Sequence, residues 1–110
     1  MNPKEKLDVI QNSLQVQNGK IVFDQKFAEQ KNLPDEIIYA IKRYVKEEND
    51  KGIEASSLET AIFPIIIWAA DLLSSLLAKK LLEMGALAFC TAFKDTNSTT
   101  KLVCDELVKQ

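Results

Sequence analysis

Two cysteines are the side chains of this chain with the most reactive chemistry. Cys90 and Cys104 stand 14 positions apart. Oxidation would close a loop of about 15 residues, worth about 3 kcal/mol if it acts by restricting the unfolded chain. In a reducing compartment the same residues are expected as free thiols. The chain contains no histidine, so neither thiol has the usual activating base, and Cys90 lies in an apolar stretch that would raise its pKa. We expect no catalytic cysteine and no metal site.

Paired carboxylates are the other residues that could do chemistry. They occur as Asp35-Glu36, Glu47-Glu48 and Asp105-Glu106. Each pair is adjacent in sequence, whereas an acid–base pair needs two carboxyls converging across a cleft with one of them desolvated. The three glycines are scattered and form no phosphate-binding loop. With a net charge of −2 and no basic stripe, the chain has no nucleic-acid footprint. The sequence predicts no enzyme, no cofactor and no nucleic-acid partner.

Local signals in the first half of the chain predict short, capped elements. A helix is expected from about Lys4 to Ser13 after the Asn-Pro start. Asn18-Gly19, between two runs that contain apolar residues, is typical of a tight β-hairpin turn. Asp24 can cap a short helix, and Pro34 starts an amphipathic helix that ends near Lys51-Gly52. We expect the charges of this last helix to form a solvated face.

The second half contains a long apolar stretch. Ala61–Phe93 carries only four charges, whereas the rest of the chain carries 26. Lys79-Lys80 divides the stretch into Ile62–Ala78 and Leu81–Phe93. This layout predicts a helical hairpin with a charged tip.

These elements together predict a mainly α fold. A capping box at Ser56-x-x-Glu59 indicates a helix start near Ser57, and Thr99–Val108 is expected as a terminal helix. The fold class is a small bundle of four to five helices with the apolar hairpin, leaving room for a small β-ribbon at Asn18-Gly19. The chain divides into a polar segment, 1–57, and an apolar segment, 58–110, or forms one domain, 1–110.

One broad apolar face is expected on the hairpin. It comprises Phe63, Ile65, Trp68, Leu72, Leu73, Leu76, Leu77, Leu81 and Met84. Asp71 lies on the opposite, polar stripe, and a charge there would cost about 2.5–3.5 kcal/mol at the centre of a membrane span. A constitutive span is therefore disfavoured. The face is expected either at a membrane interface or buried in the protein's own core or a dimer.

In organisation, the chain resembles precursors of ribosomally made antimicrobial peptides (bacteriocin-like), with Met1–Ser57 as the leader-like part and Leu58–Gln110 as the peptide-like part. The resemblance implies a membrane-active peptide or its precursor, acting through the hairpin 62–93. The alternative is a soluble helical interaction module, such as an immunity, regulatory or assembly protein.

The expected partners are accordingly a membrane surface or a protein, including a second copy of the chain. Met1–Asp8 is polar and no apolar signal region follows, so we expect a cytoplasmic product, or export by a route without a standard signal peptide. Outside the cell, a Cys90–Cys104 disulfide is expected to pin the terminal helix.

Overall fold

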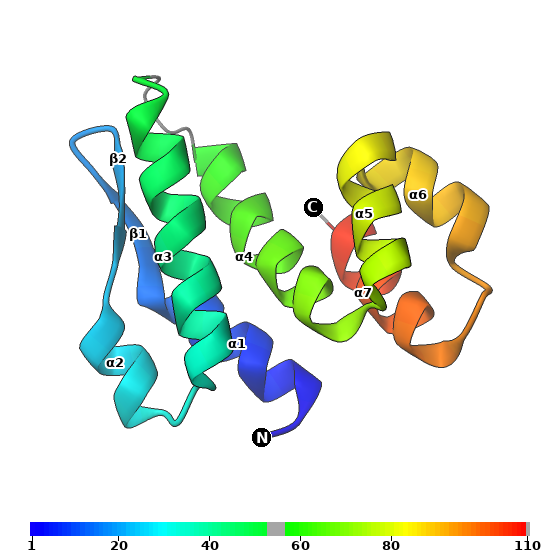
Figure 1. Cartoon of the computed structure of the whole chain (residues 1–110), viewed down its shortest axis with the longest axis horizontal. Coiled ribbons are helices and arrows are strands. Elements are labelled where there is room, and N and C mark those ends of the chain that lie inside the picture. The colour runs from blue at the N-terminus through cyan, green and yellow to red at the C-terminus, as the bar shows by residue number, and fades with distance from the viewer. Residues whose placement is uncertain (53–56, 110) are drawn as a thin grey trace. The chain divides into compact units, whose positions relative to one another are not determined.

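The computed structural model describes the backbone at residues 1–52 and 57–109, and the side chains at 1–52 and 64–109. The chain divides into two compact units, Met1–Trp68 and Ala69–Gln110. The predicted mainly α class is confirmed (Figure 1). The predicted number of four to five helices is wrong, because the described part of the chain contains seven helices besides a two-stranded sheet.

The first unit begins with α1 (Pro3–Ser13), which is followed by β1 (Leu14–Gln17), β2 (Lys20–Phe23) and α2 (Gln25–Gln30). Asn2 caps α1, since its side-chain oxygen accepts a hydrogen bond from the Glu5 backbone N–H at 2.9 Å. Asp24 caps α2 in the same way, through the Phe27 N–H at 3.1 Å. Short polar side chains therefore fix where both helices begin, as the sequence predicted.

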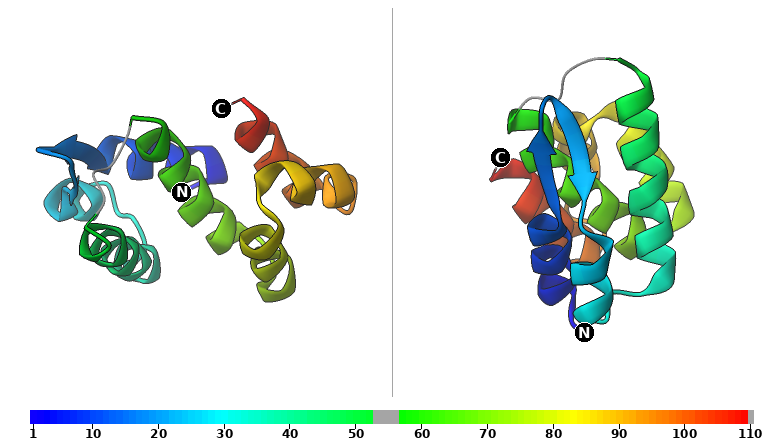
Figure 2. Two further views of the ribbon diagram at one scale, coloured as in Figure 1. Left: turned by 90° about the horizontal axis from the view of Figure 1, so that it is seen from above. Right: turned by 90° about the vertical axis from the view of Figure 1, so that its left-hand side faces the viewer.

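The ribbon expected at Asn18-Gly19 is present. β1 and β2 pair antiparallel, from Gln17 opposite Lys20 to Leu14 opposite Phe23, and Figure 2 shows them side by side. Asn18 has φ 53° and Gly19 has φ 78°, the positive values that a type I′ turn requires at both central residues.

Helix α3 (Asp35–Asp50) packs against β2 in the first unit. Pro34 precedes it, and two acidic residues occupy its first turn, where the helix dipole favours negative charge. Ile37, Ile38 and Ile41 form its buried side. The predicted amphipathic helix is confirmed.

Helix α4 (Ser57–Leu72) begins where the sequence predicted and continues through Pro64. It contributes to both units, since the first unit ends at Trp68. The expected capping box at Ser56 and Glu59 and the side chain of Phe63 lie outside the described residues.

The second unit contains α5 (Ser75–Met84), α6 (Ala86–Phe93) and α7 (Ser98–Val108). The predicted hairpin with a tip at Lys79-Lys80 is wrong, because both lysines lie inside α5. Lysine is a good helix former and does not end a helix. The breaks fall at Ser74, which caps α5 through the Leu77 N–H at 3.3 Å, and at Gly85, whose φ is 86°.

The turn between α6 and α7 ends at a polar cap. The Asn97 side-chain oxygen accepts hydrogen bonds from the Thr100 N–H at 2.8 Å and the Thr100 hydroxyl at 2.9 Å. This cap starts α7 close to the expected residue Thr99.

Candidate functional site

The structure does not bring the predicted apolar face together as one exposed surface. Ile65 and Trp68 are fully buried, and both belong to the first unit. Leu73 and Leu81 are also buried, Leu72 and Leu77 are half-buried, and Leu76 and Met84 are exposed. The expected face is therefore divided between interior and surface.

Trp68 is held by a specific polar contact. Its indole Nε1–H donates a hydrogen bond to the Pro3 carbonyl oxygen at 2.7 Å. Buried tryptophans commonly satisfy their N–H in this way. The contact joins α4 to the first turn of α1, so Trp68 is a structural residue of the first unit.

The two cysteines are joined in the structure. Cys90 on α6 and Cys104 on α7 form a disulfide, with their Cα atoms 5.6 Å apart, within the range usual for such bonds. Both residues are buried. The bond links the last two helices of the second unit across the turn at 94–97.

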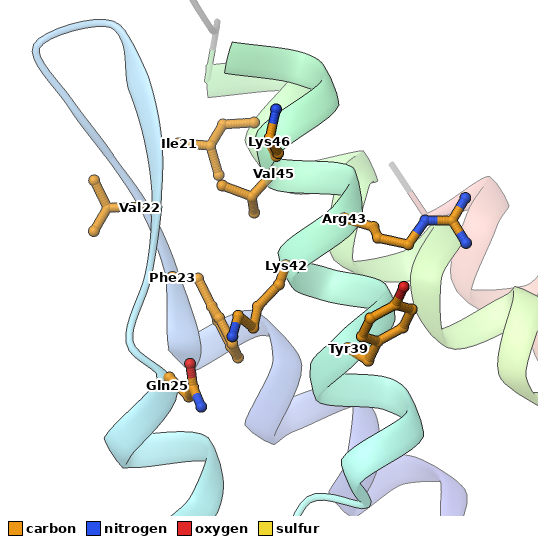
Figure 3. A pocket seen from close by; sticks show the side chains of 9 residues that line it. All are labelled: Ile21, Val22, Phe23, Gln25, Tyr39, Lys42, Arg43, Val45 and Lys46. Carbon is orange, nitrogen blue, oxygen red and sulfur yellow. The ribbon is translucent and has the colours of Figure 1, made fainter. Parts of the chain in front are cut away.

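One hollow in the first unit is an open groove along β2 and α3 (Figure 3). Its volume is about 620 Å³, a size usual for ligand sites. Its lining consists of Ile21, Val22, Phe23, Gln25, Tyr39, Lys42, Arg43, Val45 and Lys46.

Two periodicities place these side chains. Ile21 and Phe23 alternate with Val22 along β2, and Figure 3 shows the first two pointing toward α3 while Val22 points away. On α3, Tyr39, Lys42, Arg43 and Lys46 follow the spacing of one helix face. The groove therefore has an apolar wall from the strand and a basic, aromatic wall from the helix.

The three cations at the groove differ in their partners. The Arg43 guanidinium lies 3.8 Å (Nη2 to Oε1) from the Glu47 carboxylate. The Lys46 Nζ donates a hydrogen bond to Asp50 Oδ2 at 2.8 Å. This hydrogen bond and the negative charge of Asp50 raise the pKa of Lys46. The Lys42 side chain has no hydrogen bond or ion pair with the side chains described at 1–52 and 64–109. The Lys42 ammonium group is therefore an exposed positive charge at the groove.

Asn49 fixes the distance between the two walls. Its side-chain oxygen accepts from the Ile21 N–H at 3.0 Å, and its amide donates to the Ile21 carbonyl at 2.9 Å. The Lys20 ammonium also donates a hydrogen bond to the backbone carbonyl of Asn49 at 3.1 Å. These bonds hold the end of α3 against the strand, so the groove is preformed.

A second hollow is lined by residues in and next to α1 and α2, and its charges are of both signs. Its volume is about 690 Å³, and Glu5, Asp8 and Lys31 line it together. Lys31 is already placed over the Phe27 ring, 5.8 Å from its centroid. Mixed charge gives this hollow no preference for one kind of partner.

In the second unit, the two consecutive helices α5 and α6 carry exposed apolar side chains. Leu76 is 67% exposed, Leu82 56% and Leu87 78%. Leu82 and Leu87 were not predicted as part of any face.

Within the ranges that the structure describes, no helix is both long and apolar enough to cross a membrane. Nor does any cluster of three or more His, Cys, Asp or Glu residues in those ranges suit a metal ion.

The groove was not predicted from the sequence. The charges of α3 are expected there as a solvated face, although one side of the helix carries Tyr39, Lys42, Arg43 and Lys46. That spacing was the available signal. The position of β2 beside these residues depends on tertiary packing and could not be inferred from it.

Comparisons of the chain with protein-family models, with curated proteins and with solved structures found no significant match.

Proposed function

We propose that this chain is a non-enzymatic interaction protein that binds an acidic segment of a partner protein in the groove between β2 and α3. The observation that carries the proposal is Lys42, an exposed cation that has no ion partner among the described side chains and that reaches toward the apolar side chain of Phe23 (Figure 3). A carboxylate of the partner would pair with the Lys42 ammonium group. Apolar side chains next to that carboxylate would pack against the apolar wall that β2 forms.

The shape of the groove favours a protein segment over a small ligand. Pockets for small molecules usually bury most of the ligand, whereas this groove is widely open to solvent. A segment of a larger partner can cross the groove and continue beyond it. Aromatic residues and arginine, which are enriched in protein interfaces, are present as Tyr39 and Arg43.

A charge-reversal experiment tests the proposal. The probe is a set of fluorescently labelled, blocked peptides in which valine alternates with either glutamate or lysine, measured by fluorescence anisotropy. We expect the glutamate peptides to bind the wild type and the lysine peptides to fail. Lys42→Glu should lower the affinity for glutamate peptides by about tenfold, as for loss of one charge-assisted hydrogen bond.

The matched control is Lys80→Glu, which makes the same charge change at an exposed site on α5. It should leave the affinity unchanged. If both substitutions weaken binding equally, net charge and not the groove would be responsible, and the proposal would fail.

A second candidate is membrane-surface binding through α5 and α6, the activity that the resemblance to antimicrobial-peptide precursors implies. It is supported by the exposed Leu76, Leu82 and Leu87 together with Lys79 and Lys80. Exposed apolar side chains next to lysines suit the interface of anionic lipids.

Co-sedimentation with anionic vesicles tests this candidate. The double variant Leu82→Ser/Leu87→Ser should lose vesicle binding, and Asp71→Ala should strengthen it, by up to a few kcal/mol if the position reaches hydrocarbon. Because Asp71 is exposed, Asp71→Ala should change the free energy of unfolding by less than about 1 kcal/mol. Absence of vesicle binding by the wild type and by Asp71→Ala would exclude this candidate.

A further inference from the structure

We infer that the groove takes its partner as an added β-strand, hydrogen-bonded to the outer edge of β2 at Phe23, with an acidic side chain facing Lys42. The inference rests on the proposed function and specifies its binding mode. Strand addition is a common way for a sheet edge to bind an extended peptide.

The register of the hairpin shows which backbone groups face outward. In an antiparallel pair, residues alternate between positions that bond to the partner strand and positions that do not. Gln17 and Lys20 flank the two-residue turn and form a bonded pair. Beyond the other end of the ribbon, the Asp24 N–H donates to the Ser13 carbonyl at 2.7 Å. Ile21 and Phe23 are therefore the positions of β2 whose N–H and C=O groups point away from β1.

These two outward positions have different partners. The Asn49 side chain bonds to both outward groups of Ile21, as a neighbouring strand would do. The N–H and C=O of Phe23 make no such bond to any described residue. The edge of β2 is thus closed at Ile21 and open at Phe23, within the groove.

The position of Lys42 gives the added strand its chemistry. Figure 3 shows the Lys42 side chain reaching from α3 toward Phe23. A strand paired to β2 would lie about 4.7–4.9 Å from it, and alternate side chains would face α3. An acidic side chain at such a position would meet an ammonium group that lacks a partner in the described chain. The geometry therefore favours an extended segment with alternating acidic and apolar residues.

The valine–glutamate peptide provides the test, with two further probes. The first is the same peptide N-methylated on the backbone nitrogens of its three central residues, which blocks strand pairing and keeps the charge. The second is an acidic, alanine-rich peptide that forms a helix. We expect the unmethylated extended peptide to bind, and N-methylation to lower its affinity by about tenfold. Binding should also slow hydrogen exchange of the Phe23 amide, measured by NMR.

The outcomes separate the binding mode from the proposed function. If the N-methylated peptide binds as well as its parent and exchange at Phe23 does not slow, the strand mode is overturned, while charge-dependent binding at Lys42 still supports the function. If the helical peptide binds more tightly than the extended peptide, the strand mode is likewise overturned and the proposed function still stands. If neither acidic peptide binds the wild type, both inferences fail together.

Discussion

Trp68 is the residue whose surroundings most restrict how this chain can act. A tryptophan in an apolar, leucine-rich segment is expected to anchor a membrane-binding face. Here its side chain is fully buried and its indole is hydrogen-bonded to the Pro3 carbonyl. Insertion of Trp68 into a lipid interface would break this contact and expose the interior of the first unit. Membrane activity through Trp68 therefore requires partial unfolding.

Trp68→Phe tests the structural role of this residue. The substitution keeps most of the buried aromatic surface but removes the hydrogen bond from the indole to the half-buried Pro3 carbonyl. We expect the free energy of unfolding to fall by about 0.5–1.5 kcal/mol, the usual net contribution of one hydrogen bond. Urea unfolding followed by far-UV circular dichroism measures it, because the only tryptophan is lost as a fluorophore.

The wild-type fluorescence gives an independent check of the same point. Emission of the buried Trp68 should resist a soluble quencher, and anionic vesicles should not change it. A change on adding vesicles would show that Trp68 leaves its site, in contradiction of the role assigned here.

At the scale of elements, Asn49 is the side chain that joins α3 to β2. It pairs with both backbone groups of Ile21. A two-stranded ribbon is marginally stable by itself, so its order depends on packing against α3. The same side chain also covers part of a strand edge that could otherwise pair with another chain.

Asn49→Ala tests whether this side chain holds the strand. Loss of both hydrogen bonds is expected to cost about 1–3 kcal/mol of stability, and the Ile21 amide should exchange faster. The control Asn12→Ala removes an exposed bond to the Asp8 carbonyl and should cost less than about 1 kcal/mol. Unchanged exchange at Ile21 would mean that Asn49 does not hold the strand.

The elements show what local sequence can predict. Asn2, Asp24 and the Asn18-Gly19 turn were predicted correctly because a cap or a tight turn depends on a few neighbouring residues. The break at Ser74 was missed, although serine is a strong cap, because the apolar pattern continues through it. Which apolar residues are buried could not be predicted, since Trp68 and Leu76 have the same character in sequence and opposite environments in the structure.

At the scale of the whole molecule, the disulfide should stabilise only one of the two units. Cys90 and Cys104 both lie in Ala69–Gln110. Replacing both by serine should destabilise that unit by about 3 kcal/mol, the value for a loop of about 15 residues. Amide hydrogen exchange should increase in α6 and α7 and stay unchanged in α1 to α3. Equal changes in both units would show that they unfold as one.

The division of the chain also bears on whether residue 57 can be a processing site. The polar segment expected as a leader ends at Ser57, whereas the first compact unit extends to Trp68. A cut after residue 57 would remove Ile65, Ile67 and Trp68, all of them buried, from the unit to which they belong. Loss of a buried tryptophan alone costs about 3–5 kcal/mol, against a total stability of roughly 5–15 kcal/mol for a domain.

Two fragments test this consequence. A fragment of residues 1–57 should show no cooperative thermal unfolding by circular dichroism, whereas 1–72, which includes all of α4, should unfold cooperatively. The difference follows from the added apolar burial and from the hydrogen bond between Trp68 and Pro3. Trp68→Ala in the 1–72 fragment is the matched control and should behave like 1–57. If 1–57 unfolds cooperatively at the same midpoint as 1–72, the polar half is an independent leader domain, and processing after residue 57 would leave it folded.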